Sequence, residues 1–141
     1  MDQTSLYILI VAILVAVGMQ GYSITKIETL IRRTKGIIRY RPDLAEVKEV
    51  INLNMKMAVV YIVLFVIFFI IIARIFIGGR PFQAITILFL FGIITLPIGL
   101  IGKHFENKIR SMRIESDDKE IATTFERYLV QWKEARWKLP D

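Results

Sequence analysis

Three long stretches of the chain carry no charged residue, and charges are frequent in the segments between and after them. The uncharged stretches cover residues 3–25, 57–73 and 81–102. A helix needs about 20 residues, at about 1.5 Å each, to cross the hydrocarbon core of a bilayer. We therefore predict an all-α integral membrane protein with transmembrane helices over 1–23, 57–77 and 82–102, the last two joined by a turn over 78–81.

The start of the chain differs from a secretory signal peptide, which carries positive charge before its apolar core. The residues before the first apolar run are Met-Asp-Gln-Thr-Ser, with Asp2 as their only charge. We expect the first helix to be retained. Asp2 is also the only acidic residue on its side of the predicted membrane, so we expect it to contact Arg74 or Arg80, with lipid phosphate as the competing partner.

Lysine and arginine are distributed unevenly among the segments that join the predicted helices. Eight lie between the first two helices and nine follow the third, whereas only Arg74 and Arg80 lie near the turn over 78–81. Cytoplasmic loops of membrane proteins carry the excess of positive charge. We expect segments 24–56 and 103–141 in the cytoplasm of a prokaryotic cell and the amino terminus outside, with Arg74 and Arg80 as anchors at the outer interface.

The basic segment 24–56 contains two successive helical patterns. Over 24–38, apolar residues recur every three or four positions, which predicts an amphipathic helix that can lie on the inner leaflet. After it, Pro42 and Asp43 favour a helix start, and the apolar spacing predicts one continuous helix over 42–77. Positive charge alone could anchor the segment without lipid specificity. The residues that could contact anionic lipid are Lys26, Arg32, Arg33, Lys35 and Arg39.

The third apolar stretch carries small residues on one helix face. Gly92, Thr95, Gly99 and Gly102 recur at steps of three, four and three, and Pro97, which predicts a bend, lies among them. Small residues let the backbones of membrane helices approach closely. The face could pack within one three-helix unit, or it could form a seam between subunits.

The tail 103–141 ends in a second amphipathic pattern, which predicts a helix over 118–139. Five acidic and five basic residues lie between 117 and 139, so this segment is neutral. A neutral helix with aromatic anchors suits a protein groove better than a lipid surface. A partner or a second copy, the chain's own helix over 42–56, and the membrane surface are the three possible contacts. The predicted docking residues are Ile121, Phe125, Tyr128, Trp132 and Leu139, with Ala135 on the same stripe.

Composition restricts the chemistry that the chain can perform. Of its 141 residues 55% are hydrophobic, none is cysteine and one is histidine. The high hydrophobic content argues against a small water-soluble domain, and the lack of cysteine excludes thiolate metal sites and cysteine nucleophiles. No Asp, Glu, His or Lys lies in the middle of a predicted membrane helix, where membrane transporters and hydrolases usually need one. We predict no enzyme, catalytic residue, cofactor or metal.

The net charge of +6 follows from the two basic segments, and these lack the stacking and base-reading groups of a nucleic-acid interface. The partners that we expect are membrane lipids and other integral membrane proteins or copies of this chain, and not nucleic acid. We therefore expect a non-enzymatic structural or assembly subunit of a larger membrane complex. A homo-oligomeric channel is the first alternative.

The second alternative comes from the layout of the whole chain. The layout resembles the three-helix members of the Oxa1 insertase superfamily. Its parts are a helix with its amino terminus outside, a cytoplasmic helical segment, two helices joined by a tight outer turn, and a cytoplasmic tail. The layout is also similar in outline to stator subunits of ion-driven motors. The first resemblance implies an insertase or chaperone with a polar groove open to the cytoplasm. For such a groove the inner halves of the helices offer Gln20 and Thr95.

Overall fold

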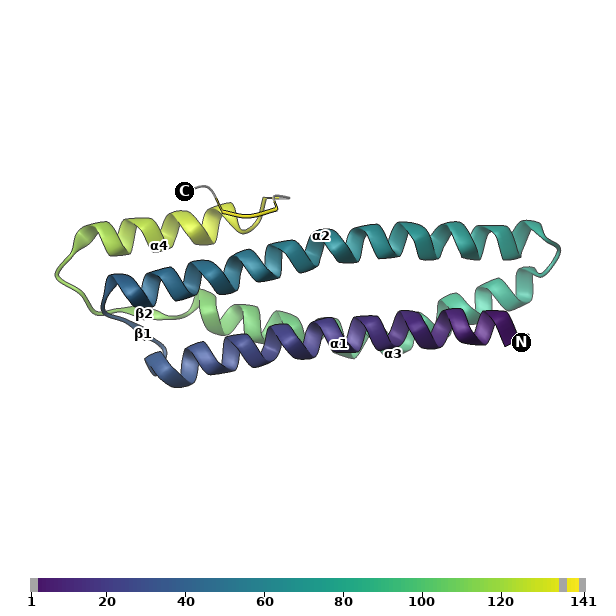
Figure 1. Ribbon diagram of the computed structural model, residues 1–141, viewed down its shortest axis with the longest axis horizontal. Helices are drawn as coiled ribbons and strands as arrows, with labels where there is room; N and C mark the ends of the chain where they lie inside the picture. The colour runs from purple at the N-terminus through teal and green to yellow at the C-terminus, as the bar shows by residue number, and fades with distance from the viewer. Residues whose placement is uncertain (1–2, 135–136, 140–141) are drawn as a thin grey trace.

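The computed structural model describes residues 3–134 and 137–139, and in this part of the chain it is helical apart from two short strands. The helices are α1 (Gln3–Thr34), α2 (Arg41–Ile77), α3 (Pro81–Arg110) and α4 (Lys119–Gln131). The strands are β1 (Ile37–Ile38) and β2 (Arg113–Ile114) (Figure 1). The all-α prediction is thus confirmed.

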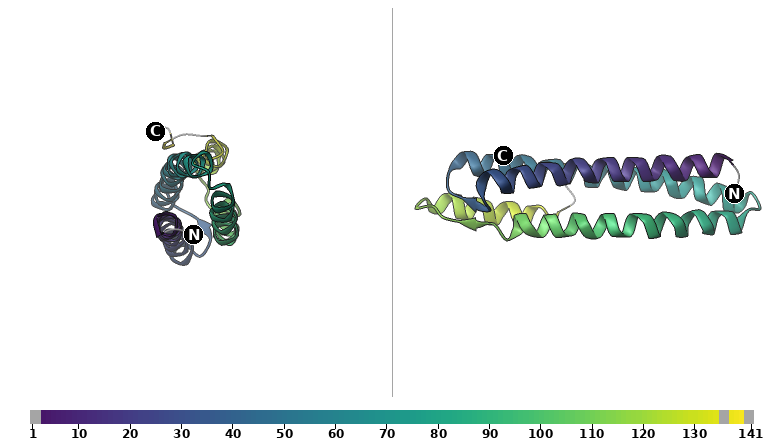
Figure 2. Two further views of the ribbon diagram at one scale, coloured as in Figure 1. Left: turned by 90° about the vertical axis from the view of Figure 1, so that its right-hand side faces the viewer. Right: turned by 90° about the horizontal axis from the view of Figure 1, so that it is seen from below.

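The first three helices are long and apolar enough to cross a membrane. At about 1.5 Å per residue they measure roughly 48, 55 and 45 Å, against roughly 30 Å for the hydrocarbon core of a bilayer. They form a three-sided bundle (Figure 2). The first residues of α1 and the α2–α3 turn lie at one end of it, here called the hairpin end. The strands and α4 lie at the other end, here called the basic end (Figure 1).

The first helix does not stop where the sequence suggested. The expected separation between a transmembrane helix over 1–23 and a second helix from residue 24 is wrong, because α1 continues to Thr34. No proline interrupts this stretch, and the hydroxyls of Thr25 and Thr29 donate to carbonyls one turn back, at 2.8 Å each. The basic segment therefore extends α1 along the bundle axis. In contrast, the continuous helix expected over 42–77 is present as α2.

The connection between α1 and α2 is a tight turn with defined ends. Lys35 and Gly36 have φ angles of 56° and 74°, in the left-handed region that ends helices. Beyond this turn, the Asp43 carboxylate accepts hydrogen bonds from the backbone N–H groups of Arg39 (3.1 Å) and Tyr40 (3.3 Å), which satisfies donors at the start of α2. The two helices are thereby held antiparallel.

A parallel strand pair joins the two connections at the basic end, and no local sequence pattern predicts it. Ile37 pairs with Arg113 and Ile38 with Ile114. The N–H of Arg113 donates to Gly36 and that of Glu115 donates to Ile38, both at 3.0 Å. The pair fixes the segment after α3 beside the α1–α2 turn, so that the chain is directed toward α2 when α4 begins.

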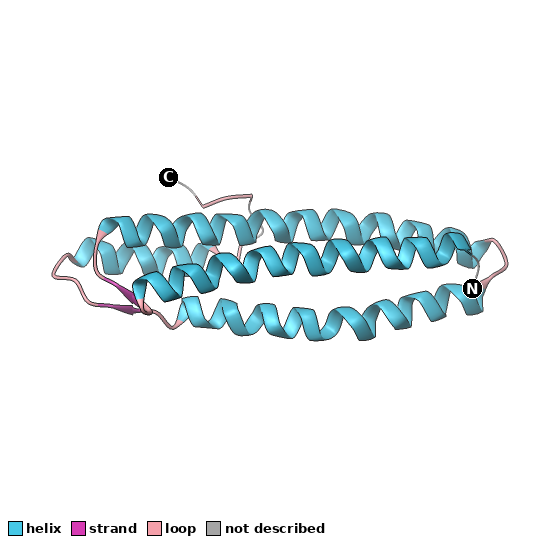
Figure 3. Ribbon diagram, turned by 60° about the horizontal axis from the view of Figure 1, so that its bottom comes forward, coloured by secondary structure: helices cyan, strands magenta, loops and turns pink. Residues whose placement is uncertain are grey.

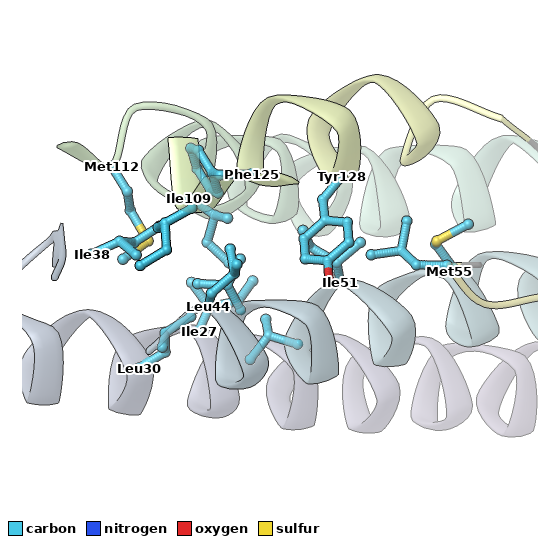
Figure 4. Packing of buried hydrophobic residues seen from close by; sticks show 14 residues of the cluster. Ile27, Leu30, Ile38, Leu44, Ile51, Met55, Ile109, Met112, Phe125 and Tyr128 are labelled. Atoms are coloured by element: carbon cyan, nitrogen blue, oxygen red, sulfur yellow. The ribbon is translucent and has the colours of Figure 1, made fainter. Parts of the chain in front are cut away.

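The helix α4 lies along the basic-end half of α2 (Figure 1). Phe125 and Tyr128 point from α4 toward Leu44 and Ile51 of α2 (Figure 4). The core of this end, called the basic-end core, draws on all four helices. Its buried members are Ile27, Leu30, Ile38, Leu44, Val47, Val50, Ile51, Met55, Ile109, Met112, Ile121, Phe125, Tyr128 and Leu139.

The predicted helix over 118–139 is therefore too long, and its apolar stripe is not free for a partner. The helix ends at Gln131. The N–H of Trp132 still donates to the carbonyl four residues back, at Tyr128 (2.9 Å), whereas that of Glu134 donates to the carbonyl three residues back, at Gln131 (3.0 Å). This tighter bonding turns the chain. Leu139 then returns to α2, where its N–H donates to the Asn52 side chain at 2.6 Å. Ala135 lies outside the described residues.

A smaller core closes the hairpin end. Phe68 of α2 stacks on Phe91 of α3 with ring centroids 4.5 Å apart, and Leu9 of α1 belongs to the same buried cluster. Near the end of the bundle the Gln83 amide donates to the Ser5 hydroxyl at 2.6 Å. This bond joins α3 to α1 where the helices begin.

Phe125→Ala tests whether α4 is held by the basic-end core. Phe125 is 3% exposed, and removing a buried phenyl group costs about 3–5 kcal/mol. We expect the free energy of unfolding in detergent to fall by about that amount, and the amide protons of α4 to exchange faster. Val130→Ala, on a side chain that is 65% exposed, is the matched control and should change little. Equal stability of the two variants would contradict the docking of α4.

Candidate functional site

Between the two cores, the middle of the bundle is not closed by its own side chains. No residue from 56 to 67 on α2, and none from 92 to 108 on α3, is buried. A groove of about 510 Å³, called the central groove, lies here between all three long helices. It is lined by Ala16, Gln20, Tyr61, Phe65, Gly92, Thr95, Leu96, Ile98, Gly99 and Leu100.

The small residues of α3 line this groove more than they pack helices together. A Cβ placed on Gly92 or Gly99 would meet nothing within 4 Å. Only Gly102 lies in close contact with a neighbour, because the Gln20 amide of α1 lies directly over it. The expected packing face Gly92–Thr95–Gly99–Gly102 is thus divided between one tight contact and an open wall. Pro97 lies inside α3, which bows in its middle (Figure 3).

Three polar side chains gather in the central groove, one from each helix. They are Gln20, Tyr61 and Thr95, and two of them were candidates from the sequence. The Tyr61 hydroxyl donates to the Ala16 carbonyl at 2.6 Å, and the Thr95 hydroxyl donates to the Phe91 carbonyl at 2.7 Å. Sequence reasoning missed Tyr61, although it carries the one hydroxyl group in the apolar run 57–73.

A second, apolar groove continues from the central groove toward the hairpin end. It measures about 330 Å³ and lies mainly between α1 and α2. Ala16, Tyr61 and Phe65 line both grooves, so the two share a wall. Its other walls are aliphatic and aromatic, such as Val11, Val15 and Leu64. Together the grooves offer an apolar surface with a few polar groups at one end, which suits an apolar ligand and offers little for bond chemistry.

The five basic residues expected to contact anionic lipid have different surroundings. Arg33 forms ion pairs with Glu46 and, at 3.6 Å, with Asp43, and Arg39 lies 3.7 Å from Glu115. These two residues are thus engaged within the chain. Arg32 and Lys35 are exposed, and the Lys26 ammonium group lies 5.6 Å from the centroid of the Tyr22 ring.

The two arginines predicted as outer anchors lie at the hairpin end. Arg74 is in the last turn of α2, and Arg80 precedes α3 as its N-cap residue. Both line a groove of about 480 Å³ together with Thr4 and Ser5 of α1. Asp2, the expected acidic contact of these arginines, lies outside the described residues.

Among residues 3–134 and 137–139, no three His, Asp or Glu side chains gather as they would around a metal ion. No family model, no curated protein and no solved structure matches this chain. What the chain can bind therefore has to be argued from the grooves themselves.

Leucine substitutions at Gly102 and Gly99 test the division of the small face. At Gly102 a large side chain meets the amide end of Gln20, which is flexible and can move aside, so the cost is at the low end for overpacking, about 1 kcal/mol or less. At Gly99 it enters open space. We expect Gly102→Leu to lower the melting temperature in detergent by a few degrees at most and Gly99→Leu to leave it close to that of the unchanged chain. A greater loss at Gly99 would show that this glycine packs against another helix.

Proposed function

We propose that the chain is a non-enzymatic structural or assembly subunit of a larger membrane protein complex. Its three long helices cross the bilayer, and the central groove receives apolar side chains from a transmembrane helix of another integral membrane protein. This revises the expectation from the sequence in one respect: the docking surface is the groove between α1, α2 and α3, and the aromatic face of α4 stabilises the chain itself.

The single observation that carries this proposal is the open middle of the bundle. A water-filled apolar groove cannot persist in hydrocarbon, so either lipid tails or a protein helix must occupy it. Gly92 and Gly99 leave the α3 backbone accessible to another helix. Close backbone approach is how membrane helices associate without a hydrophobic driving force. The Gln20 side chain lines the groove and forms no hydrogen bond within residues 3–134 and 137–139, so it adds a polar contact for a partner helix.

We place the basic end in the cytoplasm and the hairpin end outside, in a prokaryotic cytoplasmic membrane. The support is the distribution of charge: 17 of the 19 lysines and arginines belong to segments 20–56 and 103–141. The β1–β2 pair lies between these two segments, which fits their residence on one side of the membrane.

An insertase or chaperone is the second candidate, and the clustering of Gln20, Tyr61 and Thr95 in one groove favours it. A polar groove within a three-helix bundle is what the resemblance to the Oxa1 insertase superfamily implies. The two functions differ in the lifetime of the contact. An assembly subunit holds one mature partner, whereas an insertase contacts many unfinished chains briefly.

Site-specific photo-crosslinking in intact membranes tests the proposal. A photoreactive residue at Leu96, which lines the central groove, should give a product with a transmembrane segment of one defined protein. The same residue at Val66 is the control, because that side chain is 54% exposed and lines neither groove. Gly99→Leu should reduce the Leu96 product by about tenfold, because it fills the space that the partner needs.

Three other outcomes would each overturn the assembly role. Products confined to nascent chains favour the insertase. Products made of two copies of this chain replace the partner by self-association, as in a homo-oligomeric channel. Lipid adducts alone, equal at Leu96 and Val66, mean that no protein helix occupies the groove.

A further inference from the structure

A polar pocket lies between α1 and α2 at the basic end of their uncharged stretches. It measures about 400 Å³. From α1 it is lined by Tyr22, Lys26 and Thr29, which lie three or four residues apart on one face. From α2 it is lined by Glu46, Glu49 and Lys56 among others, again at steps of three or seven residues. The pocket thus combines two ammonium groups with two carboxylates.

The depth of the pocket follows from the register of the two antiparallel helices. The Ser23 hydroxyl donates to the Asn54 side chain at 2.9 Å, and Tyr61 reaches the Ala16 carbonyl at 2.6 Å. Each step forward along α1 therefore matches a step back along α2, which sets Tyr22 opposite Met55 and Lys56. Lys26 and Lys56 are also the first charged residues beyond the uncharged stretches 3–25 and 57–73. They mark the boundary between hydrocarbon and headgroups.

Both lysines direct their ammonium groups to aromatic rings. The Lys26 Nζ lies 5.6 Å from the centroid of the Tyr22 ring, and Tyr22 is one turn nearer to the hydrocarbon than Lys26. The Lys56 Nζ lies 5.9 Å from the centroid of the Trp137 ring. Within residues 3–134 and 137–139, neither ammonium group forms an ion pair with a carboxylate. Two cations in one pocket, without an ion-pair partner in the described part of the chain, suit a phosphate group.

The carboxylates lie farther from the hydrocarbon than the lysines. Glu49 precedes Lys56 by seven residues, or roughly 10 Å along α2. Glu46 is neutralised by its ion pair with Arg33, whereas Glu49 is exposed and forms no ion pair in the described part of the chain. From the hydrocarbon outward, the pocket therefore presents two cations and then one carboxylate.

We propose that this pocket binds a phospholipid whose headgroup carries a primary amine, of the phosphatidylethanolamine type. In such a lipid the phosphate is next to the glycerol and the ammonium group lies beyond it, which is the same order of charge in complementary form. The phosphate lies between Lys26 and Lys56, and the ammonium group donates hydrogen bonds to Glu49. The acyl chains leave the pocket toward the hydrocarbon along the α1–α2 surface. This site is separate from the central groove, so it does not rest on the function proposed above.

Native mass spectrometry of the full chain in detergent tests this assignment. Phosphatidylethanolamine, phosphatidylglycerol and phosphatidylcholine with identical acyl chains are titrated separately. We expect phosphatidylethanolamine to bind about tenfold more tightly than either of the others, because glycerol offers no cation and a trimethylated nitrogen has no N–H to donate. Equal binding of the three lipids would overturn the proposal.

Charge variants assign the roles within the pocket. Lys26→Gln with Lys56→Gln should weaken phosphatidylethanolamine binding by about tenfold or more, since each basic residue near a membrane surface contributes several-fold. Lys103→Gln with Lys108→Gln is the matched control, because it removes the same charge at the basic end of α3 and should leave binding unchanged. Equal losses in the two pairs would mean that net charge alone attracts the lipid.

Two further variants keep the test decisive if the glutamine pair unfolds. Lys26→Arg with Lys56→Arg retains both cations and should retain binding. Glu49→Gln, at an exposed side chain, should remove the preference for phosphatidylethanolamine while phosphatidylglycerol binding stays the same; an unchanged preference would contradict the role of Glu49. Free O-phosphoethanolamine is added as a competitor. Displacement of the lipid at equal concentration would assign the pocket to a soluble phosphate monoester instead.

Discussion

The burial of apolar side chains at the basic end is the interaction on which the rest of the structure depends. Within a bilayer, lipid tails solvate a leucine as well as another helix does, so hydrophobic burial cannot hold the three long helices together there. The basic-end core lies beyond the uncharged stretches, where burial removes apolar surface from water. It gathers residues from all four helices, and the β1–β2 pair ties the two connections beside it. Ion pairs such as Arg41 with Glu120 (3.1 Å) are exposed and contribute about 0–1 kcal/mol each. They orient α4 more than they hold it.

Because the helices are held at the basic end, the middle of the bundle can remain open. At the hairpin end Phe68 and Phe91 fill the space between α2 and α3, and at the basic end Gln20 lies against Gly102. Between these two contacts no side chain of α3 is buried, and the helix, which contains Pro97, bows there. A bundle stabilised throughout its membrane part would need larger residues at Gly92 and Gly99. The open groove is therefore not needed for the chain's own folding, which leaves it available to the partner helix proposed above.

The sequence predicted the long helices well and their surroundings poorly. Absence of charge over about 20 residues identifies a membrane-spanning helix because burying a charge in hydrocarbon is so unfavourable. The aromatic stripe of α4 was also visible, but periodicity shows only that a face will be covered and does not identify what covers it. Leu139 illustrates this: it continues the helical spacing, yet it reaches α2 through a turn of the chain and a bond to Asn52. The β1–β2 pair and the polar pocket between α1 and α2 depend on residues far apart in sequence, for which no local pattern exists.

The dimensions of the central groove restrict what can occupy it. Its limits at Phe91 and Gly102 are 11 residues apart on α3, or roughly 16 Å along the axis, about half the hydrocarbon thickness of a bilayer. A helix segment of that length and about 10 Å in diameter has a volume of roughly 1,300 Å³, which exceeds the roughly 960 Å³ of all empty space in the groove, its open mouth included. A partner helix can therefore insert one row of side chains over about three turns, and its remaining surface must face lipid or other subunits. Such a contact is too small to define a complex alone, so the partner proposed above would need a second attachment elsewhere on the chain or within the complex.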